Sequence, residues 1–293
     1  MILRAGRISK VINSCPPDPK PLWHRAVVVV GTLAGIYLLL MVGVTLNQRN
    51  MMYFPSRYPQ EVLEEYARAK QFWAWTNSAA EFIGWKRLSA TQPASGQVLI
   101  LHGNAAQALL WSDQADALQK LAPLDVYILE YPGYGPRPGK PSQKTIFKAA
   151  TEGLAALNPE RKTFLLGESL GTGVATYLAA QGKELGRPIA GMLLLAPYNN
   201  MSDVAQCHMR IFPTRWLVWD KYPSDKYLKH YAGPVGFLVA GQDRVIPKHF
   251  GLRLYESYQG PKRLWEFPEA GHDGLHCPDL DWWREALEFW NAP

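Results

Sequence analysis

Residues 163–178, T-F-L-L-G-E-S-L-G-T-G-V-A-T-Y-L, pass from an apolar strand pattern through Gly-Glu-Ser-Leu-Gly into a helical pattern. A sharp turn between a strand and a helix can lift a serine hydroxyl above a sheet, provided that the residues two positions away are small. Gly167 and Gly171 meet this requirement, so Ser169 is a candidate nucleophile. The motif alone is weak, because a chain of this length contains Gly-x-Ser-x-Gly by accident on the order of 10% of the time.

Short apolar runs alternate with helical patterns along most of the chain. We expect strands at residues 97–101, 126–129, 163–166, 189–196, 235–239 and 263–267, and helices at 108–121, 143–157, 172–182 and 281–290. Continuous apolar strands that alternate with helices predict an α/β fold, with a mostly parallel central sheet flanked by helices on both faces. Ligands of such sheets bind at the carboxyl ends of the strands.

A serine hydroxyl becomes a good nucleophile only beside a base, and that base needs an orienting acid. Where a serine sits on an elbow of this kind, the order along the chain is serine, acid, histidine. Asp243 follows the strand at 235–239, and His272 follows the strand at 263–267. The sequence therefore predicts Ser169, Asp243 and His272 as nucleophile, acid and base.

The sequence leaves rivals for two of these roles: His276 for the base, and Asp203, Asp220 and Asp225 for the acid. The oxyanion of a tetrahedral intermediate also needs two N–H donors. We expect the backbone N–H of Leu170, which follows the nucleophile, and that of Asn104 in the loop after the strand at 97–101. Ala105 is the alternative to Asn104.

The order of these motifs resembles the α/β-hydrolase superfamily over roughly residues 72–293. The matching pieces are H-G-N-A (102–105), G-Y-G (133–135), G-E-S-L-G (167–171), G-Q-D-R-V-I-P (241–247) and G-H-D-G (271–274). The chain is particularly similar to membrane-anchored members, in which a Tyr-Phe-Pro-type segment follows the anchor, here M-Y-F-P-S at 52–56. The resemblance implies a serine hydrolase without cofactor or metal, in which Ser169, Asp243 and His272 form the triad. Gln107 and the proline-rich loop at 136–143 depart from the usual pattern and bear on pocket shape.

Residues 26–46 carry no charge and are long enough to cross a hydrocarbon core of about 30 Å as a helix. A buried core helix would keep a polar face, and a signal peptide would be shorter and end in a cleavage site. We therefore expect an uncleaved signal anchor. Five basic residues precede it, and only Arg49 and Arg57 follow closely, which predicts a cytoplasmic N-terminus and a catalytic domain on the other side.

The expected organisation is a basic tail at 1–25, the anchor at 26–46, a juxtamembrane link at 47–71 and the hydrolase domain at 72–293. The aromatic-rich stretch at about 198–233 interrupts the strand–helix alternation. We interpret it as a helical lid over the strand ends, and the alternative is a surface excursion with a small core of its own.

The net charge of +6 does not indicate nucleic-acid binding. The tail carries five basic residues and one acid, which leaves only about +2 for the rest of the chain. The spacing of Cys15, Cys207 and Cys277 does not match a zinc site. For Cys207 and Cys277, a disulfide and two unpaired thiols are equally compatible with the sequence.

The sequence thus predicts a membrane-anchored serine hydrolase that cleaves a carboxylic ester or thioester through an acyl-enzyme. The anchor and the aromatic insertion favour a small-molecule or lipid-like ester, as for a carboxylesterase, thioesterase or lipase. The alternatives are a serine peptidase of the same fold and a non-catalytic binding protein on a hydrolase scaffold.

Overall fold

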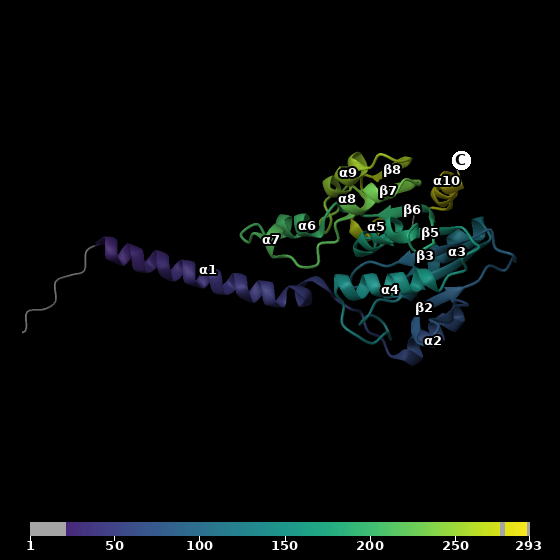
Figure 1. Cartoon of the computed structure of the whole chain (residues 1–293), viewed down its shortest axis with the longest axis horizontal. Helices are drawn as coiled ribbons and strands as arrows, with labels where there is room; N and C mark the ends of the chain where they lie inside the picture. The colour runs from purple at the N-terminus through teal and green to yellow at the C-terminus, as the bar shows by residue number, and fades with distance from the viewer. Residues whose placement is uncertain (1–21, 276–278, 292–293) are drawn as a thin grey trace, which may run out of the picture. The chain divides into compact units, whose positions relative to one another are not determined.

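A computed structural model describes residues 22–275 and 279–291 of the chain (Figure 1). The chain divides into two compact units, Met1–Leu46 and Asn47–Pro293. Helix α1, Leu22–Met52, includes the whole apolar stretch at 26–46 and is long and apolar enough to cross a membrane. Its last residues, 47–52, belong to the second unit.

The second unit is built on an eight-stranded sheet with the order β1-β2-β4-β3-β5-β6-β7-β8. The strands are β1 Trp73–Thr76, β2 Phe82–Arg87, β3 Gly96–Leu101, β4 Leu124–Leu129, β5 Thr163–Glu168, β6 Ile189–Leu195, β7 Val235–Ala240 and β8 Lys262–Phe267. Strands β3 to β8 pair in parallel, whereas β1 with β2 and β2 with β4 pair antiparallel. The predicted mostly parallel sheet is therefore confirmed.

Helices cover both faces of this sheet (Figure 1). Helices α4 (Gln143–Ala155), α5 (Leu170–Gly182) and α9 (Lys248–Ser257) share one core cluster, and α2 (Gln60–Ala69), α3 (Ser112–Leu121) and α10 (Leu280–Asn291) share the other. Strand β3 shows why there are two cores: Leu99 and Leu101 join the first, Val98 and Ile100 the second. Alternate side chains of a strand point to opposite faces, so a strand buried on both sides is apolar throughout.

The segment at 47–71, expected as a link, contains α2, whose Leu63 and Ala67 are buried in the core. The sequence also did not indicate β1 and β2. Strand β1 has only four residues, three of them exposed, and β2 contains Gly84, which weakens a strand pattern.

Between β6 and β7 the chain forms only short helices: α6 Met201–His208, α7 Thr214–Leu217, α8 Ser224–Tyr227 and the 3-10 turn η2 Leu228–His230. The insertion at 198–233 is thus helical, as expected. Outside the insertion, two further 3-10 turns, η1 Ala108–Trp111 and η3 His272–Leu275, follow β3 and β8.

Candidate active site

The elbow between β5 and α5 holds Ser169 in a strained backbone conformation, with φ 47° and ψ −113°. Such conformations cost of order 1–3 kcal/mol and persist only where the surroundings impose them. The Ser169 N–H donates to the carbonyl of Leu195 on β6 at 2.8 Å, which ties the turn to the sheet. A Cβ at Gly171 would overlap the carbonyl oxygen of Leu101, and one at Gly167 would lie 2.6 Å from the Gly171 oxygen. Both glycines are therefore required by the close approach of backbone.

The structure brings Ser169, His272 and Asp243 into one hydrogen-bonded chain. His272 Nε2 lies 3.1 Å from Ser169 Oγ, and His272 Nδ1 lies 2.7 Å from Asp243 Oδ2. The Asp243 side chain is only 1% exposed, and its Oδ1 accepts the N–H groups of Val245 (2.8 Å) and Ile246 (2.7 Å). This fixed carboxylate favours the tautomer with a proton on Nδ1, which leaves Nε2 to accept from the serine hydroxyl.

The rival acids lie in other contacts. Asp203 pairs with Arg215, Asp220 pairs with Arg49, and the Asp225 carboxylate accepts the N–H of Lys226. The rival base His276 lies outside the described residues, as does Cys277, the suggested disulfide partner of Cys207. Across residues 22–275 and 279–291, no cluster of three or more His, Cys, Asp or Glu could hold a metal ion.

One of the two expected oxyanion donors lies at the start of α5, and the other lies in the loop after β3. Leu170 is the first residue of α5, and the N–H groups of a helix's first turn have no acceptor within the helix. Asn104 lies in the loop after β3, and its side chain fixes that loop. Its Oδ1 accepts from Phe54 N–H (3.0 Å) and the Tyr134 hydroxyl (2.7 Å), and its Nδ2 donates to the Met52 carbonyl (2.6 Å).

The segment that follows α1 is thus bound directly to the loop that carries Asn104. Ser56 Oγ also donates to the carbonyl of the alternative donor residue, Ala105, at 2.6 Å, and Ser56 O accepts from Gly135 N–H at 2.9 Å. Sequence reasoning missed this contact, because the residues lie about 50 positions apart. The sequence identified the Tyr-Phe-Pro-type segment as a motif but did not indicate which residues this segment contacts.

Two buried carboxylates hold the other side of the same loop. Glu168 Oε2 accepts the N–H of Gly103 at 3.1 Å. Glu130 Oε1 lies 3.2 Å from His102 Nε2, without hydrogen-bond alignment, and both side chains are fully buried. Glu130 Oε2 accepts from the N–H of Ala108 at 3.2 Å. His102 and Glu168 therefore belong to the buried contacts that shape this loop.

Two buried tyrosines bind backbone carbonyls beside the two expected oxyanion donors. The Tyr131 hydroxyl donates to the His102 carbonyl at 3.0 Å, and the Tyr198 hydroxyl to the Leu170 carbonyl at 3.4 Å. Burial raises the pKa of Tyr131 and of Tyr198 well above the ordinary value, so both hydroxyls keep the proton that they donate. The same cause raises the pKa of Tyr222, which packs against Gly173 of α5.

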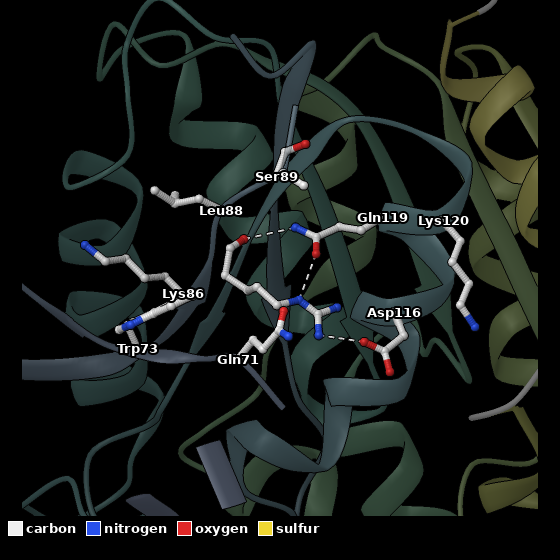
Figure 2. Close-up of a pocket in the computed structure, with 10 residues that line it drawn as sticks. Gln71, Trp73, Lys86, Leu88, Ser89, Asp116, Gln119 and Lys120 are labelled. Atoms are coloured by element: carbon white, nitrogen blue, oxygen red, sulfur yellow. Dashed lines mark hydrogen bonds and ion pairs between the residues drawn. The ribbon is translucent and has the colours of Figure 1, made fainter. Parts of the chain in front are cut away.

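A cavity of about 630 Å³ lies at the other end of the sheet, where β2 and α3 end (Figure 2). Arg87 pairs there with Val126 at the start of β4, so the cavity is not at the carboxyl ends of the parallel strands. Its polar groups bind one another: Arg87 Nε donates to Gln119 (2.7 Å) and its Nη1 pairs with Asp116 (2.6 Å). The triad and not this cavity is the candidate active site.

Comparison with known proteins agrees with the fold. A family model described as alpha/beta hydrolase fold matches residues 96–214. An uncharacterized protein of Mycobacterium tuberculosis is 30% identical over 256 residues, which cover 85% of this chain and 89% of that protein.

The lysophosphatidylserine lipase ABHD12 of Rattus norvegicus is 30% identical over 202 residues, 62% of this chain and 50% of that protein. The chain therefore matches about half the length of this lipase. Among solved structures, a Paleococcus ferrophilus monoacylglycerol lipase superposes with a TM-score of 0.54 at 22% identity, over 70% of this chain and 96% of that one.

Proposed function

We propose that this chain, which belongs to the α/β-hydrolase superfamily, is a serine hydrolase with Ser169, Asp243 and His272 as its catalytic triad. The observation that carries the proposal is the position of His272, with one ring nitrogen on Ser169 Oγ and the other on Asp243. A strained serine elbow, a base and a fixed acid form the arrangement that activates a hydroxyl.

The proposed reaction is acyl transfer to water. Ser169 Oγ attacks the carbonyl carbon while His272 Nε2 takes its proton, and the backbone N–H groups of Leu170 and Asn104 stabilise the oxyanion. The intermediate collapses when the bond to the leaving group breaks, and His272 protonates that group. Water then attacks the acyl-enzyme with His272 as base, which releases the acid and restores the serine. Asp243 holds the imidazole in the required tautomer throughout.

The proposed substrate is a carboxylic ester or thioester with a lipid-like acyl group. The apolar helix α1 and the likeness to a lysophosphatidylserine lipase and a monoacylglycerol lipase support this class. The proposed organisation keeps the tail at 1–25 in the cytoplasm, the anchor at 26–46 in the membrane, and the hydrolase domain at 72–293 on the other side. The insertion at 198–233 would act as the lid.

Labelling with a fluorophosphonate probe tests the catalytic proposal. The wild-type chain and the control Ser95→Ala, which alters an exposed serine, should be labelled, whereas Ser169→Ala should not. Labelling of Ser169→Ala at the wild-type level would rule out Ser169 as the nucleophile.

A substrate panel tests the substrate class. Purified protein should hydrolyse monoacylglycerols, lysophospholipids or long-chain acyl thioesters. Activity confined to short water-soluble esters would contradict the lipid-like assignment, and activity confined to peptides would favour the peptidase alternative.

A further inference from the structure

A second cavity, of about 470 Å³, lies between two parts of the second unit: the end of α1 with the segment after it, and the start of α4 with the loop before it. Its lining comes from residues 49–57 and 139–145, all within the second compact unit. We call it the Arg49 cavity. Its volume falls in the range of small-molecule sites, about 300–1,000 Å³.

The lining of the Arg49 cavity is cationic, although the Asp220 carboxylate offsets the charge of Arg49. Arg49, Arg57 and Lys140 line it, and none of its lining residues is acidic. Arg49 uses Nε and Nη2 to bind Asp220, at 3.0 and 3.2 Å, and a guanidinium has five N–H donors in all. Several cations around one cavity are groups that bind phosphate.

The surroundings of the cavity favour a lipid as the source of that phosphate. Arg49 lies three positions after Leu46, where the apolar stretch ends, which corresponds to about 4.5 Å of helical rise. In a helix that spans the membrane, a residue at this distance beyond the hydrocarbon core lies among the lipid headgroups. The insertion meets the same place, because the Gln48 side chain accepts from Trp219 N–H at 2.8 Å. The Arg49 guanidinium lies 5.5 Å from the centre of the Trp219 ring.

The tip of the insertion exposes large aromatic side chains beside these cations. Trp216 is 84% exposed and Trp219 is 51% exposed. Tryptophan is enriched where proteins meet the membrane–water interface, because its ring is apolar and its N–H remains hydrated. Exposed tryptophans and a cationic cavity at one place match the two components of an anionic lipid surface.

We propose that the Arg49 cavity binds the phosphate of an anionic phospholipid headgroup, with Trp216 and Trp219 among the neighbouring headgroups. No triad residue lines this cavity, and the proposal goes beyond the proposed hydrolysis. The choice of a lipid over free phosphate rests on the proposed membrane anchor.

Binding measurements on the full chain in detergent test the proposal. All variants carry Ser169→Ala, so that no ligand is hydrolysed and the result does not depend on the catalytic proposal. Short-chain phosphatidylglycerol and inorganic phosphate are titrated separately by calorimetry. The double variant Arg57→Gln with Lys140→Gln should weaken phosphatidylglycerol binding roughly thirtyfold. This fold-change follows because each cation near an anionic lipid surface contributes about 1 kcal/mol of binding free energy, and two are removed.

The matched control is Lys183→Gln with Lys226→Gln, which removes two exposed cations that do not line the cavity. This control should bind phosphatidylglycerol as the parent does. Equal affinity of both double variants would overturn the site, and inorganic phosphate binding as tightly as phosphatidylglycerol would overturn the lipid assignment. Trp216→Gln should weaken phosphatidylglycerol binding and leave phosphate binding unchanged, and the lack of any effect would remove Trp216 from the membrane contact.

Discussion

The triad corner and the H-G-N-A loop at residues 102–105 lie beside the same serine but are held in different ways. The triad residues follow three of four neighbouring parallel strands, β5, β7 and β8, with β6 between β5 and β7, so the sheet itself brings them together. The H-G-N-A loop is positioned by partners from elsewhere: Met52, Phe54 and Tyr134 on the Asn104 side chain, and Glu168 on Gly103. Strand topology can therefore assemble the proposed triad, whereas the loop that carries the proposed oxyanion donor Asn104 depends on the segment that follows α1.

The largest expected effect is at the acid of the triad corner. Asp243→Asn should lower kcat/KM about 10⁴-fold, because an amide N–H₂ facing Nδ1 favours the wrong imidazole tautomer. Asparagine retains an oxygen for the N–H groups of Val245 and Ile246, so the unfolding temperature should stay near that of the wild type. Ester-hydrolysis kinetics and thermal melting measure the two quantities. Asp203→Asn, a former rival, is the control, and near-normal activity of Asp243→Asn would exclude Asp243 as the acid.

The next effect is at the elbow glycine. Gly171→Ala places a methyl group against the Leu101 carbonyl, so β3 and the elbow must separate. Misplacement of a catalytic group by about 1 Å can cost on the order of 10²-fold, and we expect a loss of at least that size in kcat/KM. The control is Gly271→Ala, where an added Cβ meets nothing within 4 Å. Similar losses in both variants would show that the close approach at Gly171 is not what matters.

A smaller effect is expected at the H-G-N-A loop. Asn104→Ala removes three hydrogen bonds but leaves its own backbone N–H, and Glu168 and Ser56 still hold the loop. Loss of an oxyanion donor costs about 10²–10³-fold, so a loosened donor should cost about tenfold, in kcat rather than KM. Steady-state kinetics on a soluble ester separate the two. A change in KM alone would argue that Asn104 contacts substrate and does not position the oxyanion donor.

The smallest expected effect is on the pH dependence of stability and comes from the buried tyrosines Tyr131 and Tyr198. Because burial raises the pKa of Tyr131 and of Tyr198, the folded state keeps them neutral above the ordinary tyrosine pKa of about 10. Their contribution to stability is therefore fully present below about pH 10 and is lost as pH rises toward the raised values. In a series of alkaline buffers, these groups should leave the melting temperature unchanged up to about pH 10 and lower it at higher pH. Stability unchanged well above pH 10 would contradict their burial as neutral donors.

Most of the triad corner could be predicted from the sequence. Ser169 and Asp243 each follow an apolar strand, and His272 follows the more polar strand β8. Parallel strands share an edge at their carboxyl ends, so residues that follow them are expected to meet there. The H-G-N-A loop could be predicted only as a motif. Its buried partner Glu130 sits in a turn-rich stretch, and a carboxylate there has no pattern that distinguishes it from a solvated one. The edge strand β1 was not predicted for a related reason, since a short and mostly exposed strand lacks a clear periodic signal.

The sequence by itself determined the apolar helix, the parallel sheet and the serine–acid–histidine order, because each depends on local hydrophobic patterns and on steric demands of adjacent residues. Only the tertiary structure decided that residues 52–56 bind Asn104 and Ala105, and that Arg49 shares a cavity with Lys140. These pairings join segments about 50 to 90 positions apart, and proximity over such separations leaves no periodic trace in the chain.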